Sequence, residues 1–143
     1  MVTKQLSVFI ENRKGRLGEV LRVLKDNGVN IQSLSLADTT EYGLLRLIVD
    51  NPEEGKAQLL DAGFSAMLTD VLIIKVPHTP GGLQDVLLAV SDSDINVEYM
   101  YACVGKMSGK AIMIIRTDDP KAAAEILHKE GYGDINPADV YRI

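Results

Sequence analysis

Two stretches of the sequence repeat one pattern and decide the fold: residues 15–31 read GRLGEVLRVLKDNGVNI, and residues 81–97 read GGLQDVLLAVSDSDINV. A shift of 66 residues (81 minus 15) superimposes Gly15 on Gly81. Both stretches carry apolar residues at positions i, i+3, i+4 and i+7, the spacing of one buried helix face. These residues are Leu17, Val20, Leu21 and Leu24, and then Leu83, Val86, Leu87 and Val90. Each stretch therefore predicts a helix followed by a strand.

The repeat continues beyond these stretches and organises the whole chain. After a two-residue insertion the shift becomes 68 (120 minus 52), which aligns Pro52 with Pro120. The 143 residues therefore divide into two units, 1–69 and 70–143, with no Gly/Ser linker between them. A unit of about 70 residues buries only about 60% of its unfolded surface. We therefore expect the two units to be docked together.

Each unit has the predicted order strand, helix, strand, strand, helix, strand, and residues 5–10 show the period-2 alternation of a half-buried strand. The expected strands of the first unit lie at 5–10, 30–37 and 44–49, and a fourth begins at 64 or 65. Its expected helices run from 17 to an end within 26–28 and from 52 to about 62. Those of the second unit are strands at 71–76, 95–104, 111–116 and within 135–143, and helices at 83–90 and from 120 to about 130. Asn51 and Asp119 each precede a proline, which is typical of an N-cap. The order predicts an α+β fold of two tandem ferredoxin-like βαββαβ units, each an antiparallel sheet covered by two helices.

The composition excludes several kinds of partner. The chain has 15 basic and 20 acidic residues, a formal net charge of −5, whereas nucleic-acid binding depends on Lys and Arg that neutralise phosphates. No segment approaches the ~18 consecutive apolar residues of a membrane span. The first ten residues show no signal-peptide architecture, and the single Cys103 cannot form an internal disulfide. We therefore expect a cytoplasmic protein with neither nucleic acid nor membrane as its partner.

Residues 12–17 read NRKGRL between a strand and a helix, and residues 77–83 read PHTPGGL at the same place in the second unit. Each segment resembles the opening of an ACT domain, and nearly the whole chain resembles the small stand-alone tandem ACT proteins that have no attached enzyme. The resemblance implies a non-catalytic regulatory protein that binds an amino acid at domain interfaces, without a cofactor or metal. It also implies a homo-oligomer, expected as a dimer, that regulates an enzyme or another regulator. The implied ligand-binding residues are Asn12, Arg13, Lys14, Gly15, Arg16, Leu17, Asn30, Ile31, His78, Thr79, Pro80, Gly81, Gly82, Leu83, Asn96 and Val97.

The implied loops have a chemistry that suits an amino acid. The N–H groups of the first helical turn lack internal partners and favour an anion, so the ligand carboxylate is expected there. The resemblance implies that the loop of one unit faces the start of the second strand in a neighbouring unit. The ligand ammonium would then meet a carbonyl group or the side-chain oxygen of Asn30 or Asn96.

Several of these residues also have a purely structural explanation. Gly15 and Gly81 either let a ligand approach the backbone or simply permit a tight turn into the helix. Lys14 and Arg16 either attract an anionic ligand or are ordinary solvated charges. His78 is either a ligand contact or a plain surface residue.

Three other classes of function compete with ligand binding. The sequence has no G-x-S-x-G, G-x-x-x-x-G-K-[ST] or H-E-x-x-H motif, which argues against an enzyme. An RNA-binding sheet needs exposed aromatic residues, and only Tyr99 and Tyr101 suit that role. We expect these tyrosines to pack in the fold and Cys103, on the same face, to be a buried thiol. The remaining alternative is a protein-interaction adaptor that regulates a partner without binding a small ligand.

Overall fold

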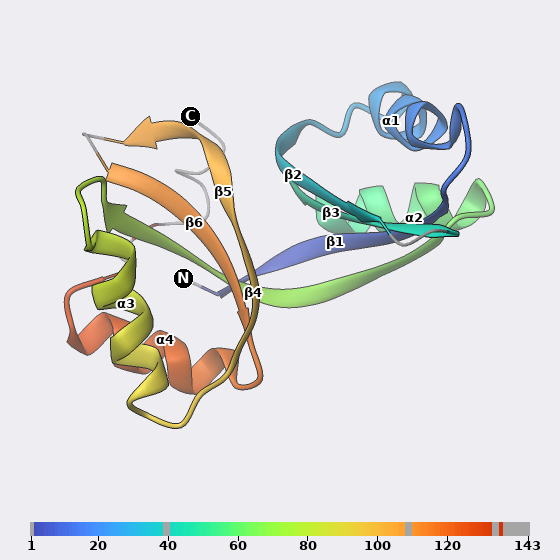
Figure 1. The fold of residues 1–143 in the computed structure, drawn as a ribbon. Coiled ribbons are helices and arrows are strands. Elements are labelled where there is room, and N and C mark those ends of the chain that lie inside the picture. Colours follow the sequence, from blue (N-terminus) through green and yellow to red (C-terminus); the bar gives the residue numbers. More distant parts are fainter. Residues whose placement is uncertain (1, 39–40, 108–109, 133–134, 136–143) are drawn as a thin grey trace. The chain divides into compact units, whose positions relative to one another are not determined.

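The computed structural model describes residues 2–38, 41–107, 110–132 and 135. These residues form six strands and four helices (Figure 1). In chain order the elements are β1 (Val2–Glu11), α1 (Arg16–Asp26), β2 (Ile31–Asp38), β3 (Tyr42–Val49), α2 (Pro52–Asp61), β4 (Ser65–Pro77), α3 (Gly82–Ser91), β5 (Val97–Met107), β6 (Lys110–Thr117) and α4 (Pro120–Lys129).

The chain divides into two compact units. The first unit consists of residues Lys4–Thr69, and the second of residues Met1–Thr3 together with Asp70–Ile143. Strand β4 belongs to both units, because it is continuous across the division between Thr69 and Asp70. The prediction of one strand from 64 or 65 and a separate strand at 71–76 is therefore wrong, because a single strand spans both. No glycine or proline interrupts the segment before Pro77, so nothing in it forces a turn.

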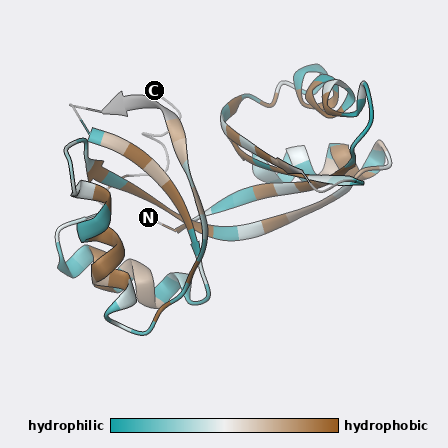
Figure 2. Ribbon diagram, in the orientation of Figure 1, coloured by the Kyte–Doolittle hydropathy of each residue, from teal (hydrophilic) through white to brown (hydrophobic). Residues whose placement is uncertain are grey.

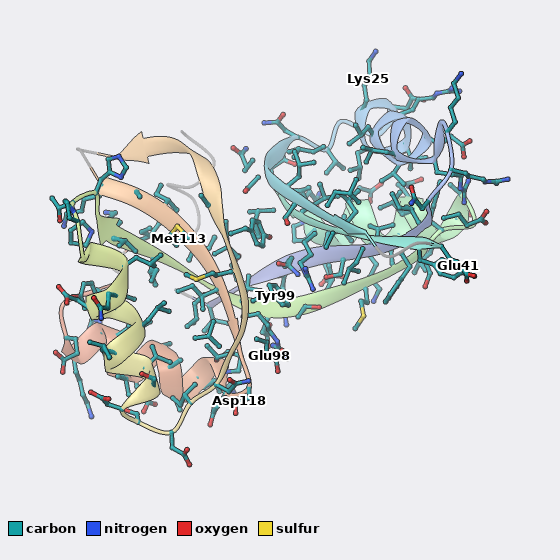
Figure 3. The ribbon with its side chains drawn as sticks, in the orientation of Figure 1. Lys25, Glu41, Glu98, Tyr99, Met113 and Asp118 are labelled. Carbon is teal, nitrogen blue, oxygen red and sulfur yellow. The ribbon has the colours of Figure 1, made fainter. Side chains whose placement is uncertain are left out.

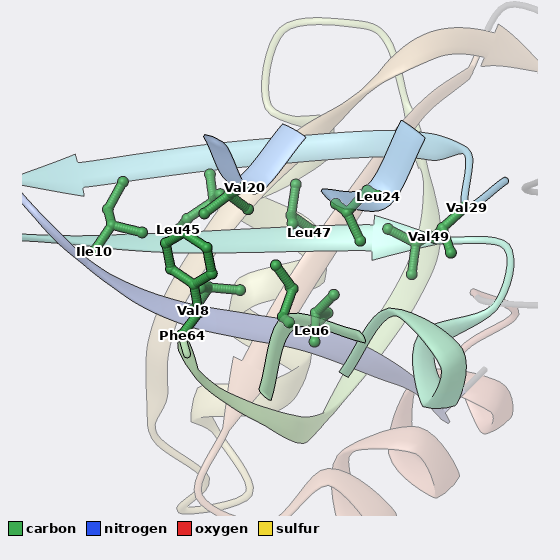
Figure 4. Close-up of a cluster of buried hydrophobic side chains, with 11 residues drawn as sticks. Leu6, Val8, Ile10, Val20, Leu24, Val29, Leu45, Leu47, Val49 and Phe64 are labelled. Atoms are coloured by element: carbon green, nitrogen blue, oxygen red, sulfur yellow. The ribbon is translucent and has the colours of Figure 1, made fainter. Parts of the chain in front are cut away.

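The first unit has the antiparallel sheet and paired helices expected of a ferredoxin-like fold. Its strands follow the order β2-β3-β1-β4, and Leu47 at the centre of β3 pairs with Leu6 on one side and Leu34 on the other. One apolar cluster joins this sheet to α1 and α2 (Figure 4). Its buried members are Leu6, Val8, Ile10, Val20, Leu24, Val29, Leu45, Leu47, Val49, Leu59 and Phe64.

The second unit repeats this arrangement in the order β4-β6-β5. Ile115 on β6 pairs with Leu72 on β4 and with Met100 on β5. Most residues of β4 after Asp70 and of β6 are hydrophobic (Figure 2), and one apolar cluster joins these strands to α3 and α4. The buried members of this second cluster are Leu72, Ile74, Val76, Val86, Val90, Ile95, Ile115, Ala123 and Leu127. The strand predicted within 135–143 lies outside the described residues, apart from Ile135, which is buried.

Both predicted helix caps are confirmed. The side-chain oxygen of Asn51 accepts a hydrogen bond from the Glu54 N–H at 3.2 Å, and that of Asp119 accepts one from the Ala122 N–H at 3.1 Å. In each helix the proline that follows the cap occupies the first turn, where its missing N–H costs nothing. The same local chemistry therefore starts α2 and α4 at equivalent places.

Replacing Leu47 with alanine tests how much the first cluster stabilises the protein. Leu47 is fully buried at the centre of its sheet, so the loss of transfer energy and the cavity left behind should lower the free energy of unfolding by about 2–5 kcal/mol. The matched control is Leu60→Ala on α2, where the side chain is 48% exposed and the change should cost less than about 1 kcal/mol. Urea unfolding followed by circular dichroism measures both variants, and equal losses would contradict this account of the core.

Candidate functional site

The two predicted ligand loops turn from strand to helix in the same way. Gly15 and Gly81 precede α1 and α3 with φ angles of 89° and 84°, in the left-handed region. Each turn is closed by a backbone hydrogen bond, from Arg16 N–H to the Arg13 carbonyl at 3.3 Å and from Gly82 N–H to the Thr79 carbonyl at 3.0 Å. A glycine is therefore required at both positions by backbone conformation alone.

The two predicted strand positions are also built alike. The N–H of Asn30 donates to the Asp50 carboxylate at 2.9 Å, and the N–H of Asp50 donates back to the Asn30 carbonyl at 3.1 Å. Asn96 and Asp118 form the same reciprocal pair, at 3.0 and 3.1 Å. The backbone of each asparagine is thus fixed at the start of its strand, while both asparagine residues are exposed to solvent.

Within one unit, the loop and the asparagine lie at opposite ends of the sheet. The N–H of Asn12 donates to the Glu41 carbonyl at 2.9 Å, just before β3 begins, whereas Asn30 is held by Asp50, just after β3 ends. In the second unit, Pro77 pairs with the first residue of β6 and Val97 with its last. Neither unit brings its own loop together with its own asparagine. A site of the implied type would need the loop of one unit and the strand of another.

A shallow groove lies where β2 begins. It encloses about 420 Å³ between the end of α1 and the start of β2, and Lys25 extends from α1 beside it (Figure 3). Its lining residues are Leu21, Leu24, Lys25, Gly28, Val29, Asn30 and Ile31. The predicted residues Asn30 and Ile31 therefore form one side of an open, largely apolar depression.

A second hollow lies beside the first loop, and of its lining residues only Arg16 was predicted from the sequence. It encloses about 210 Å³, and its lining includes Arg16 from the predicted loop. The guanidinium carbon of Arg16 lies 4.4 Å from the centre of the Phe64 ring. Its complete lining is Phe9, Ile10, Glu11, Arg16, Tyr42, Gly63, Phe64 and Ser65. One feature of the sequence could have indicated this hollow: Phe9 is an aromatic residue on the side of an alternating strand that faces away from the core.

The two loops differ in the residue that follows the left-handed glycine, which is Arg16 in the first loop. Gly82 occupies the equivalent place in the second loop (16 plus 66), and it is buried. A Cβ atom at Gly82 would lie 2.3 Å from the Pro77 carbonyl oxygen, so the backbone itself fills that space. His78, Thr79, Pro80 and Gly81 are all exposed. The second loop therefore presents an exposed turn at the position where the first presents a charged side chain.

The remaining sequence candidates have ordinary surroundings. Cys103 is buried as a free thiol, as predicted, and Tyr99 and Tyr101 are half-buried. Over the described ranges, no group of His, Cys, Asp or Glu side chains could hold a metal ion. None of the helices within those ranges combines the length and apolarity that crossing a membrane requires.

The fold and its repeat define a pair of ferredoxin-like domains, and comparison with known proteins gives the family. A family model described as "ACT domain pair" matches residues 1–142, so the chain belongs to the ACT domain pair family. The crystal structure of protein BT0572 from Bacteroides thetaiotaomicron is 35% identical, with a TM-score of 0.91 over 100% of this chain and 98% of that chain.

More distant structures share the fold. The ligand-free regulatory subunit of aspartate kinase from Thermus thermophilus has a TM-score of 0.63 at 17% identity, over 90% of this chain and 94% of that one. The corresponding subunit from Thermus flavus has a TM-score of 0.61 at 18% identity, with the same coverage. No curated protein sequence matches this chain significantly.

Replacing Gly82 with alanine tests whether the second loop is packed as tightly as its geometry indicates. The new Cβ would overlap the Pro77 carbonyl, and the resulting backbone shift should destabilise the protein by about 1–3 kcal/mol. The control is Gly18→Ala in the first turn of α1, where nothing lies within 4 Å of the new atom and the better helix propensity of alanine should stabilise by up to about 1 kcal/mol. Urea unfolding measures both, and a neutral Gly82→Ala would refute the packing.

Proposed function

We propose that this protein is a non-catalytic regulatory module that binds an amino acid or a similar small ligand at its ACT domains. The ligand-binding elements are the loops at residues 12–17 and 78–83 and the strand starts at Asn30–Ile31 and Asn96–Val97. The observation that carries the proposal is the duplicated geometry of loop and strand start, in a chain that belongs to the ACT domain pair family. The structural likeness to regulatory subunits of aspartate kinase supports the same class of function.

The loop geometry suits the recognition of a carboxylate. Both helices begin without a side-chain cap. The first N–H of each helix, of Arg16 and of Gly82, donates to a loop carbonyl, and the N–H groups that follow it in the first turn are left to other acceptors. The helix dipole adds partial positive charge at the same place. An exposed asparagine from a neighbouring unit supplies an oxygen that can accept a hydrogen bond from the ligand ammonium. Docking of the two units, a homodimer and a cytoplasmic location stay predictions of this proposal.

A second candidate function, a protein-interaction adaptor, is supported by exposed apolar side chains. Leu34 and Leu36 are 47% and 45% exposed on β2, which is an edge strand of its sheet, and Leu88 is 46% exposed on α3. An edge strand can pair with a strand of another chain. The two functions are compatible, and a pure adaptor differs in showing no stabilisation by amino acids.

Thermal unfolding of the purified protein in the presence of each of the twenty amino acids tests the proposal. A ligand that binds only the folded state stabilises it by about 2.7 kcal/mol at a hundredfold excess over Kd, which raises Tm by roughly 2–4 °C for each kcal/mol. We expect such a shift with one amino acid or with a few that are chemically related. No shift with any of them at millimolar concentration would reject ligand binding and favour the adaptor.

The placement of the ligand is tested by alanine substitutions at Asn12 and Asn96, singly and together. Loss of a hydrogen bond to a charged ligand group costs about 1.5–3 kcal/mol, which is roughly a tenfold to hundredfold rise in Kd. Glu125→Gln, at an exposed position on α4, is the control and should leave affinity unchanged. Calorimetric titration with the amino acid found above gives each Kd, and wild-type affinity in both single variants and the double variant would reject this placement.

A further inference from the structure

We propose that the hollow beside Arg16 is a binding pocket for an amino acid with an aromatic side chain, and that the chain has one such pocket. The inference rests on the proposed function. It specifies the chemical class of the ligand and assigns its binding to the first loop, which contains Arg16. Every residue of the pocket belongs to the first unit. Most of them lie outside the two loops and strand starts named above.

The wall of the pocket is aromatic. The whole chain has two phenylalanines and five tyrosines, and both phenylalanines and one tyrosine line this single hollow. Phe9 is 50% exposed and Tyr42 is 55% exposed, although large aromatic side chains are usually covered by other groups. Their rings are available to an incoming ring, which aromatic side chains contact edge to face or offset-stacked.

Arg16 gives the pocket a cation with unused hydrogen-bonding capacity. Its side chain is only 20% exposed, and its Nη1 atom binds the Glu19 carboxylate at 2.5 Å. The Nε atom is buried and has no hydrogen-bond partner among the residues that the structure describes. A buried donor without a partner is costly, and a carboxylate can accept two parallel hydrogen bonds from a guanidinium group. A ligand carboxylate at Arg16 would satisfy this donor once the side chain turns to present Nε to the hollow.

Glu11 gives the lining of the same pocket an anion. It pairs directly with Tyr42 across β1 and β3, so the two side chains share one face of the sheet. Its carboxylate binds the Arg13 Nε at 3.0 Å, but both side chains of that pair are more than half exposed. An exposed ion pair of this kind contributes little, and an ammonium group can replace Arg13 in it. A cation, an anion and aromatic walls together complement a zwitterion that carries an aromatic ring.

The volume of the pocket limits the size of its ligand, and the residues at the equivalent places of the second unit indicate how many ligands one chain binds. A volume of about 210 Å³ lies below the range of about 300–1,000 Å³ found for drug-sized ligands, so a single amino acid fits better than a nucleotide. In the second unit, Lys75, Pro77 and Gly82 stand at the places of Phe9, Glu11 and Arg16 (a shift of 66). Tyr132 stands at the place of Phe64 (a shift of 68), so the second unit keeps one ring. It lacks the exposed ring of Phe9, the anion of Glu11 and the cation of Arg16 at the equivalent places, and we therefore expect one ligand per chain.

Isothermal titration calorimetry of the full-length protein with L-phenylalanine tests the pocket. We expect one bound ligand per chain. Two analogues separate the charged contacts: 3-phenylpropionate lacks the ammonium group and phenethylamine lacks the carboxylate. Each analogue should bind at least about tenfold more weakly, since each loses a charge-assisted hydrogen bond. Equal binding of either analogue, or two equivalent ligands per chain, would overturn the assignment.

Substitutions tie the ligand to this pocket. Arg16→Gln should weaken L-phenylalanine binding at least about tenfold, and Arg16→Lys, which keeps the charge but loses the planar fork, should weaken it less. Arg22→Gln, at an exposed position of the same helix, is the control for charge. Phe9→Ala should weaken L-phenylalanine more than L-alanine, and Met67→Ala, equally exposed on β4, should change neither.

The same titrations separate this inference from the proposed function. If another amino acid binds and its Kd is unchanged in folded Arg16→Gln and Arg16→Lys proteins, the module binds a ligand elsewhere and the pocket is rejected. If none of the twenty amino acids binds, the proposed function fails and the pocket fails with it. Circular dichroism of each variant establishes that it is folded before its Kd is compared.

Discussion

The register of β1 on β3 is the constraint on which the first unit depends. Leu6 pairs with Leu47 and Val8 with Leu45, so the apolar side chains of both strands face the helices. A slip of one residue would turn every one of these side chains to the opposite face. The same register places Glu11 opposite Tyr42. This pairing therefore sets the core and part of the pocket: Glu11 and Tyr42 lie on the face opposite the core, whereas Ile10 and Phe64, which also line the pocket, belong to the core.

The two repeats keep the same backbone devices and differ in their side-chain chemistry. Left-handed glycines before α1 and α3, and proline-containing caps on α2 and α4, recur at equivalent positions. These devices fix where each helix begins, so they are needed for the fold whatever the unit binds. The exposed side chains of Phe9 and Glu11 in the hollow of the first unit have no such role, and Lys75 and Pro77 stand at the equivalent places. A tandem repeat of this kind can keep two stable units while only one of them carries a charged and aromatic pocket.

Local patterns predict most of the fold, because each rests on a short-range rule. The helical stripe at Leu17–Leu24, the alternation at Leu6–Ile10 and the caps at Asn51 and Asp119 all gave elements that the structure contains. The continuous β4 was not predicted, because the sequence carries two repeats and nothing in a repeat shows that one strand joins them. The pocket was not predicted as a set, since Phe9, Tyr42 and Phe64 lie far apart in sequence and only strand pairing and packing gather them. Arg16 was named from its loop, but its position over the Phe64 ring required the structure.

Arg16 connects the fold of the first unit to its proposed chemistry. It is the first residue of α1, and Gly15 before it sets the direction in which the helix leaves the loop. Its guanidinium lies over Phe64, a ring that belongs to the buried cluster. A ligand that bound Arg16 would therefore contact the start of α1 and, through Phe64, the edge of the core. Binding there would stabilise the turn, the helix and the start of β4 together, which is how a small ligand can change the stability of a whole unit.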